Sequence, residues 1–395
     1  MYLTREEEQV LKGSEGPVAA KCMRLLAKLG DIYGADRMID VSSCQAAGVS
    51  YKSIGEPGLN FLKGFAREGA IVKVPTFLNP AGMDLECWEE IPVSREFAVK
   101  QKEIIEAFSR MGTVPTCSCT PYLFGNLPRF GEHLAWSESS AVSFANSVIG
   151  ARTNREGGFS ALASAITGKA PDYGLHRSEN RVPQIRVDVS AALKDSADFG
   201  AMGYFAGLVV KNRIPFFTGI TTAGTDGLKS LGAAMAASGA VALYHMESIT
   251  PEACLYDPSA IAETIEFNKA NLEESYRALS NCNEPDLIVI GCPHASISEI
   301  QLLAQKLRGK ILKKEFWVCT SKAMKAWSDR MGYTNDLEAA GARILCDTCM
   351  VVSPLEETKF GCIGTNSGKA AKYIPGFCKK KVYFGNTDML IEKAL

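Results

Sequence analysis

The last third of the chain alternates short apolar runs with helical segments, and this pattern constrains the fold more than any other feature. The apolar runs cover residues 287–291, 316–319, 343–346 and 381–384. Ser296 and Glu299 form a capping box for a helix that runs to about Leu307, and a further helix begins at Ser321. Strands that alternate with helices form βαβ units and a mostly parallel sheet. The sequence therefore predicts an α/β region over residues 281–395.

The preceding part of the chain predicts helices and strands that lead into loops of small residues. Thr4 and Glu7 form a capping box, and a second helix is expected from Gly16 to Leu29, with Gly30 after it. Strands are expected at residues 38–41 and 70–74. Residues 115–251 are rich in Gly, Ala and Ser, which permit close backbone packing. We expect residues 1–280 to form an N-terminal α/β region of more than one subdomain.

Charge and hydropathy exclude several classes of protein. The chain has 43 Lys and Arg against 44 Asp and Glu, so it has no basic field for nucleic acid. The first residues are charged rather than apolar, which argues against a signal peptide. Apolar stretches are interrupted before the roughly 20 residues that a membrane helix needs. We therefore expect a cytoplasmic protein that does not cross a membrane.

Three cysteines follow short apolar segments and are candidate ligands of an iron–sulfur cluster. Cys292 follows residues 287–291, Cys349 follows residues 343–346, and Cys119 lies in a loop of small polar residues. The carboxyl ends of parallel strands frame the ligand crevice of an open α/β sheet, and thiolates hold such clusters. Ordinary buried cysteines without a metal, or a zinc site, remain open alternatives. Cys346 and Cys349 form only a single C-x-x-C pair, which is weak evidence for zinc.

Two loops offer the groups of an anion site. Residues 151–158 combine two arginines, an asparagine and a glutamate before a glycine pair, and arginine is suited to phosphate or carboxylate. Residues 364–370 offer backbone N–H groups, a hydroxyl and the Lys369 ammonium. A salt-bridged loop and a simple helix cap are the structural alternatives. His294 is placed to form a hydrogen bond near a metal, and the absence of a G-x-S-x-G elbow disfavours a hydrolase.

Taken together, several segments resemble the aconitase X family, and in particular its large subunit. They extend over nearly the whole chain in the family's order, which makes the resemblance more specific than any single motif. The matching segments are residues 48, 50–52, 119–122, 151–158, 166–168, 173–176, 291–294, 347–349 and 366–369.

The resemblance implies an aconitase-like α/β fold, with several subdomains and mostly parallel sheets around a central cluster cleft. It implies a 4Fe-4S cluster on Cys119, Cys292 and Cys349, with one iron left open for substrate. Cys117 and Cys346 are not required by the family motif. The implied substrate contacts are Gly48, Val49, Ser50, Asn79, Pro80, Ser367 and Gly368. The resemblance does not identify the general base.

The resemblance also implies a hydro-lyase with a separate small subunit, similar to the mobile swivel domain of aconitase, because this domain is absent from the 395 residues. The family dehydrates either mevalonate 5-phosphate, in an isoprenoid route, or cis-3-hydroxy-L-proline. We favour mevalonate 5-phosphate, with anhydromevalonate 5-phosphate as product, because a two-subunit, cysteine-rich enzyme suits an archaeal protein. The alternatives are the hydroxyproline enzyme and a non-catalytic or redox iron–sulfur protein.

Overall fold

The C-terminal part of the chain forms a five-stranded parallel sheet in the computed structural model, which describes residues 1–395. The order is β12-β11-β10-β13-β14, and the strands are β10 (Leu287–Ile290), β11 (Glu315–Thr320), β12 (Ala342–Cys346), β13 (Cys362–Thr365) and β14 (Lys381–Phe384). Its helices are α10 (Ile297–Leu307), α11 (Lys322–Met331), α12 (Tyr333–Ala339), α13 (Gly368–Tyr373) and α14 (Thr387–Ala394). Central β10 is buried along its whole length, which explains its continuous apolar run.

The structure confirms the predicted strands of this region and the capping box of Ser296 and Glu299. One strand of the sheet, β13, was not predicted from the sequence; it lies between β10 and β14. Its four residues include Gly364 and Thr365 and follow Gly361, so they lack a recognisable apolar run. The fold is α/β with mostly parallel sheets, as predicted.

Two further parallel sheets lie in the N-terminal and middle parts of the chain. One has the order β3-β2-β4, with β2 (Cys44–Ala46), β3 (Thr76–Leu78) and β4 (Ala135–Trp136). The other has the order β8-β7-β6-β9, with β6 (Ile185–Val189), β7 (Pro215–Thr218), β8 (His245–Met246) and β9 (Thr264–Phe267). A small antiparallel pair joins β1 (Met38–Asp40) to β5 (Lys169–Pro171).

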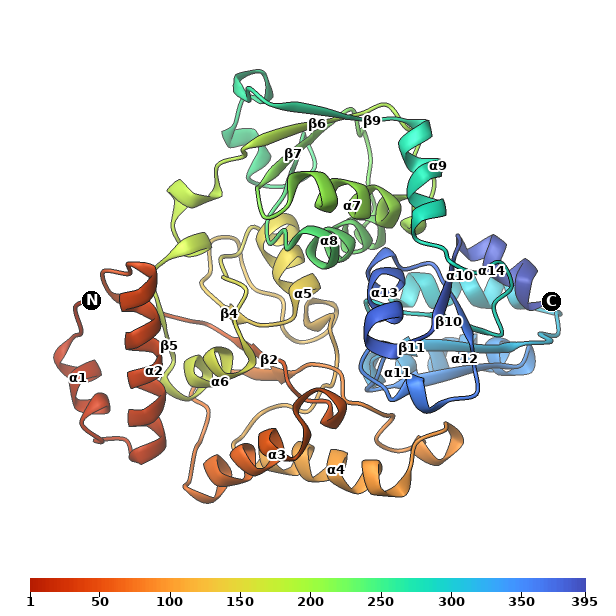
Figure 1. Cartoon of the computed structure of the whole chain (residues 1–395). Helices are drawn as coiled ribbons and strands as arrows, with labels where there is room; N and C mark the ends of the chain where they lie inside the picture. Colours follow the sequence, from red (N-terminus) through yellow and green to blue (C-terminus); the bar gives the residue numbers. More distant parts are fainter.

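Helices from all parts of the chain meet at the centre of the molecule (Figure 1). The N-terminal helices are α1 (Arg5–Leu11), α2 (Pro17–Tyr33), α3 (Tyr51–Arg67), α4 (Arg95–Arg110), α5 (Ser139–Phe144) and α6 (Gly158–Thr167). The middle helices are α7 (Ser196–Val210), α8 (Thr225–Gly239) and α9 (Lys269–Ala278). Helix α8 packs against α5, α7 and α13 and thereby connects the three sheet regions.

Glycine permits the close packing of these central helices. A Cβ atom on Gly203 of α7 would lie 2.5 Å from the carbonyl oxygen of Leu231 in α8. A Cβ atom on Gly368, the first residue of α13, would lie 2.7 Å from the carbonyl oxygen of Gly200 in α7. The small residues noted in the sequence therefore set the position of α13 and of Lys369, which follows Gly368.

Two local predictions were wrong. Helix α2 does not stop at Gly30 but continues to Tyr33, and Gly34 adopts the left-handed conformation at its end. Gly30 is instead a packing position, because a Cβ there would meet the Met1 sulfur at 2.4 Å. Residues 70–74 form no strand; the strand β3 begins after Pro75. The division into residues 1–280 and 281–395 stays a prediction.

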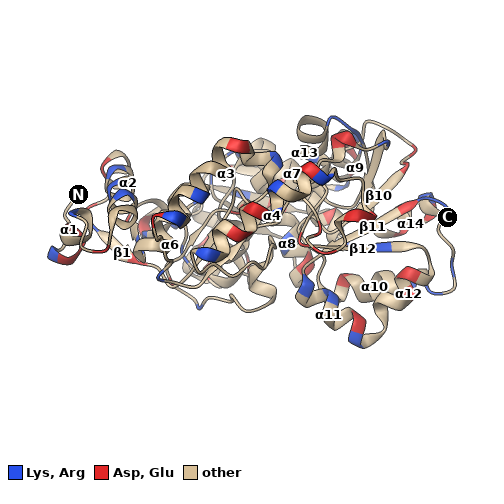
Figure 2. Ribbon diagram, turned by 90° about the horizontal axis from the view of Figure 1, so that it is seen from below, with Lys and Arg blue, Asp and Glu red and all other residues tan.

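The helices carry mixed surface charge, and two of the cysteines are paired. Basic and acidic residues are mixed along the helices seen in Figure 2, in keeping with the balanced charge of the chain. No helix is long and apolar enough to span a membrane. A disulfide joins Cys282, in the loop before β10, to Cys362 at the start of β13, and the other eleven cysteines are unpaired.

Candidate active site

Three parts of the chain that are far apart in the sequence place their cysteines on one cavity of about 240 Å³. Cys119 follows Ser118, whose N–H donates to the carbonyl oxygen of Leu78 at the end of β3. Cys292 follows β10, and Cys349 follows β12. All three residues are buried, with at most 7% of their surface exposed. The other lining residues are Asn79, Pro80, Ser137, Glu138, Ser139, Val351, Val352, Lys369, Tyr373 and Phe377. The structure thus brings together the three predicted ligands.

His294 holds the three cysteine loops together. Its backbone N–H donates to the Cys119 sulfur at 3.2 Å, and its Nε2–H donates to the Thr348 carbonyl oxygen at 2.8 Å. Burial lowers the pKa of His294 to about 4, so the ring is neutral near pH 7. Nδ1 then carries no proton and accepts a hydrogen bond from the Ser118 hydroxyl at 3.0 Å. This histidine orients the loops through hydrogen bonds.

The surroundings of the thiols favour a negatively charged sulfur at Cys349. A hydrogen bond from the Cys292 thiol, together with the backbone N–H groups of Val352 and Val351, lowers the pKa of Cys349 to about 7 despite its burial. The same hydrogen bond and burial raise the pKa of Cys292, and burial raises that of Cys119 to about 12. Bound metal lowers the pKa of a coordinating thiol further.

The donor set fits an iron–sulfur group better than a lone ion. Three thiols line the same cavity, and thiolates are the ligands that such clusters use. No three His, Cys, Asp or Glu side chains converge closely enough to enclose a single metal ion. A zinc site, which needs its ligand atoms about 2.0–2.3 Å from one point, therefore fits the cavity poorly.

A nearly buried ion pair forms the polar wall of the cavity. The Lys369 ammonium donates to the Glu138 carboxylate, and the Asn79 amide donates to the same carboxylate at 2.8 Å. Burial raises the pKa of Glu138, but Lys369 and the hydrogen bonds outweigh it and hold that pKa at about 2. Burial likewise opposes the charge on Lys369, but Glu138 and the thiols raise its pKa. The wall therefore presents a permanent ammonium beside the three sulfurs.

The predicted substrate contacts occupy different positions relative to the cavity. Asn79 and Pro80 line it directly. Ser50 does not line the cavity, but its hydroxyl donates to the carbonyl oxygen of the lining residue Val352 at 2.8 Å. Gly48 lines a separate apolar groove. Val49 is buried, with its carbonyl bound to the Gln101 amide. Ser367 caps α13 and Gly368 begins it, so both adjoin Lys369 without lining the cavity.

The arginine loop at residues 151–158 is not part of this cavity. The Arg152 guanidinium donates to the His176 carbonyl oxygen at 2.8 Å, and that of Arg155 donates to the Ala240 carbonyl oxygen at 2.9 Å. Both arginines therefore bind the protein's own backbone. Neither arginine forms the salt bridge that the structural alternative predicted; Arg155 binds a backbone carbonyl, and Arg152 lines a second cavity elsewhere in the molecule.

Four residues that line the cavity were not predicted from the sequence: Glu138, Ser137, Tyr373 and Phe377. Glu138 follows the carboxyl end of β4, where a binding residue is expected in a parallel sheet. The strand has only two residues, so no apolar run marks it in the sequence. Tyr373 and Phe377 lie one and two turns after Lys369, a spacing that a helix beginning at Gly368 would have indicated.

Comparisons with known proteins agree over the whole chain. The three domain models of aconitase X match residues 1–179, 183–277 and 285–395. The phosphomevalonate dehydratase large subunit of Methanocaldococcus jannaschii is 52% identical, over 99% of this chain and 100% of that protein. The cis-3-hydroxy-L-proline dehydratase of Pseudomonas aeruginosa is 33% identical, over 98% of this chain and 69% of that protein. The crystal structure of Thermococcus kodakaraensis aconitase X (holo-form) is 46% identical, with both chains covered completely and a TM-score of 0.93.

Proposed function

Because the chain belongs to the aconitase X family, we propose that it is the large subunit of a hydro-lyase that dehydrates mevalonate 5-phosphate to anhydromevalonate 5-phosphate. Relatives that carry the name phosphomevalonate dehydratase large subunit are about half identical over their full length. The cavity supports the proposed dehydration, because Cys119, Cys292 and Cys349 line it together with the Lys369 ammonium.

The three cysteines would hold a 4Fe-4S cluster, and their surroundings suit that role. Backbone N–H groups of His294, Val351 and Val352 point at Cys119 and Cys349 and stabilise the thiolate forms that a cluster requires. When bound, a cluster with three protein ligands supplies an open iron whose Lewis acidity assists the departure of hydroxide. Eleven of the thirteen cysteines are unpaired, as in a reducing compartment, and only Cys282 and Cys362 form a disulfide; on this balance we place the enzyme in the cytoplasm.

The residues of the chain bind and orient the substrate. Lys369 would face an anionic group of mevalonate 5-phosphate, and Glu138 and Asn79 would fix the ammonium in place. Hydroxyls of Ser137 and Ser139 line the same wall. Because the pKa of Glu138 is held at about 2, its carboxylate is a weak base, and we assign it a positioning role. Of the other predicted contacts, Pro80 lines the cavity, whereas Gly48, Val49, Ser50, Ser367 and Gly368 stay proposed contacts that do not line it.

A small partner subunit would close the cavity. The name large subunit, carried by the phosphomevalonate dehydratases, implies a small one, and the two cis-3-hydroxy-L-proline dehydratases have about a third of their own length outside the match. Phe377 lines the cavity yet leaves 61% of its surface exposed, so an aromatic side chain remains uncovered at the mouth. We propose that the partner resembles a swivel domain, covers this mouth and expels water.

We expect the isolated chain to be inactive and to gain dehydratase activity when the small subunit is added. An open mouth leaves water in the site, where water weakens electrostatic interactions with the substrate. The measurement is loss of mevalonate 5-phosphate under argon, with the chain alone, the partner alone and both together. As a control, the small subunit is mixed with the Cys292→Ser chain, which shows whether the small subunit accounts for any of the activity. Full turnover by the isolated chain would contradict the two-subunit proposal.

A further inference from the structure

A second, larger cavity of about 550 Å³ lies at the other end of the β3-β2-β4 sheet. Glu138 of the candidate active site follows the carboxyl end of β4, whereas His133 of the second cavity precedes its amino end. Arg152 forms one further part of the wall, and the rest comes from β1, from the loop before it and from the segment after β5. Eight of its nine lining residues are polar, and its volume is in the range of small-molecule sites.

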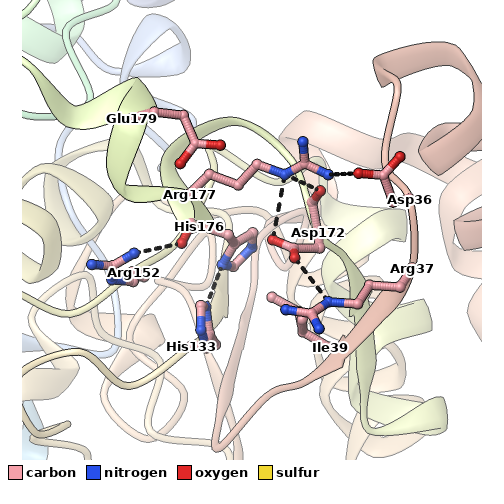
Figure 3. A pocket seen from close by; sticks show the side chains of 9 residues that line it. All are labelled: Asp36, Arg37, Ile39, His133, Arg152, Asp172, His176, Arg177 and Glu179. Carbon is pink, nitrogen blue, oxygen red and sulfur yellow. Dashed lines mark hydrogen bonds and ion pairs between the residues drawn. The ribbon is translucent and has the colours of Figure 1, made fainter.

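The floor of the cavity is a pair of histidines with an unsatisfied nitrogen. Nδ1 of His133 and Nδ1 of His176 lie 3.0 Å apart, so one donates a hydrogen bond to the other (Figure 3). His176 is 1% exposed, and its Nε2 has no hydrogen-bond partner. A buried polar atom without a partner is costly, so a ligand or a water that reached it would be stabilised.

Arginine side chains surround this floor and retain free N–H donors. Figure 3 shows Arg152 on one side of the histidine pair and Arg37 and Arg177 on the other. Arg37 binds Asp172 only through Nε, at 3.2 Å, which leaves both of its terminal amino groups without a protein partner. Arg177 uses Nε and one amino group for Asp172 and Asp36, and its other amino group is free.

From these contacts we propose that the second cavity binds a small metabolite that carries a phosphate or carboxylate group. Free guanidinium groups on Arg37 and Arg177 suit such an anion, because arginine binds it through paired N–H donors. The Glu179 carboxylate at the rim has no cationic partner and would accept hydrogen bonds from hydroxyl or amino groups of the ligand.

Three arginines and three carboxylates line the cavity, so the free N–H donors of Arg37 and Arg177, and not a net charge, favour an anion. Burial and the charges of Arg152 and Arg181 keep the pKa values of both histidines below the usual value, so neither ring adds a charge near pH 7. No third metal-binding side chain joins the two histidines closely enough to complete a site.

Arg37 is the residue of choice for a test. Its side chain is 71% exposed, so a substitution should not disturb folding, and Arg110 is a matched control with an exposed guanidinium on α4. Calorimetry with pyrophosphate on the complex of both subunits should detect a site that Arg37→Gln weakens at least about tenfold, since the substitution removes the guanidinium charge and its paired N–H donors. Arg37→Lys should bind with intermediate affinity, and Arg110→Gln should bind like the wild type.

Parallel measurements separate the two cavities. Lys369→Met removes the cation of the candidate active site and should leave the Arg37-dependent pyrophosphate site intact. Arg37→Gln should leave the KM for mevalonate 5-phosphate unchanged. Citrate tests whether carboxylates share the site with phosphates. Unchanged pyrophosphate affinity in Arg37→Gln, or no binding of pyrophosphate or citrate in Lys369→Met, would overturn the proposal, whatever substrate the enzyme dehydrates.

Discussion

Serine in place of Cys119, Cys292 or Cys349 is expected to abolish dehydration and to release iron. Each sulfur lines the same cavity, and a hydroxyl is a poor substitute for a thiolate ligand. A Lewis acid supplies several kcal/mol, and each 1.36 kcal/mol is a tenfold change in rate, so a loss of about a thousandfold or more should follow. Iron content, visible absorbance and activity are measured after anaerobic purification. Thermal stability should fall as well, because a bound metal group contributes to folding.

Cys346→Ser is the matched control for this series. Cys346 is buried at the end of β12, three residues before Cys349, and it does not line the cavity. Its backbone N–H, which serine retains, donates to Asp84 at 2.8 Å. The control should therefore keep its iron and most of its activity. Full iron retention in all three test variants, or equal loss in Cys346→Ser, would refute the ligand assignment.

Lys369→Met should lower kcat/KM for mevalonate 5-phosphate by about a hundredfold or more and should also destabilise the chain. The ammonium is the charge that we assign to the substrate anion, and charge-assisted hydrogen bonds contribute about 1.5–3 kcal/mol each. The substitution also leaves Glu138, whose side chain is 12% exposed, without its cation. Breaking a buried ion pair on one side costs about 3–5 kcal/mol. Steady-state kinetics and urea unfolding measure the two effects separately.

The double variant Glu138→Gln, Lys369→Met distinguishes substrate binding from structural support. Removing both charges takes away the uncompensated carboxylate, so most of the lost unfolding free energy should return. Activity should stay low, because the ammonium is still missing. Recovery of activity together with stability would show that Lys369 only supports the wall and does not act on the substrate.

The sequence indicated the three proposed cluster ligands because strand ends and the family resemblance agreed on the same residues. Cys292 and Cys349 follow apolar strands that are readable in the sequence, and the structure places both on the cavity with Cys119. Glu138 could not be found this way, since its strand has two residues and its importance comes from an ion pair with Lys369, 231 positions away. Only the fold brings those two charges together.

The arginine loop shows a different limit of sequence reasoning. Arg152 and Arg155 belong to one motif and looked like one anion site, but they point to different parts of the molecule. Their neighbours decide their roles: Arg155 binds the carbonyl of Ala240 after α8, whereas Arg152 lies beside the histidine pair. Residue type and spacing therefore did not show that these two arginines bind carbonyl oxygens of distant parts of the chain.

The most direct test of the proposed function is a substrate comparison on the anaerobically assembled complex of this chain with its small subunit. Mevalonate 5-phosphate, unphosphorylated mevalonate and cis-3-hydroxy-L-proline are offered at equal concentration, and water loss is followed by mass spectrometry of the products. We expect rapid formation of anhydromevalonate 5-phosphate, and poor reaction of mevalonate, which lacks the phosphate. Efficient dehydration of cis-3-hydroxy-L-proline without turnover of mevalonate 5-phosphate would contradict the proposed function and assign the chain to the other branch of its family.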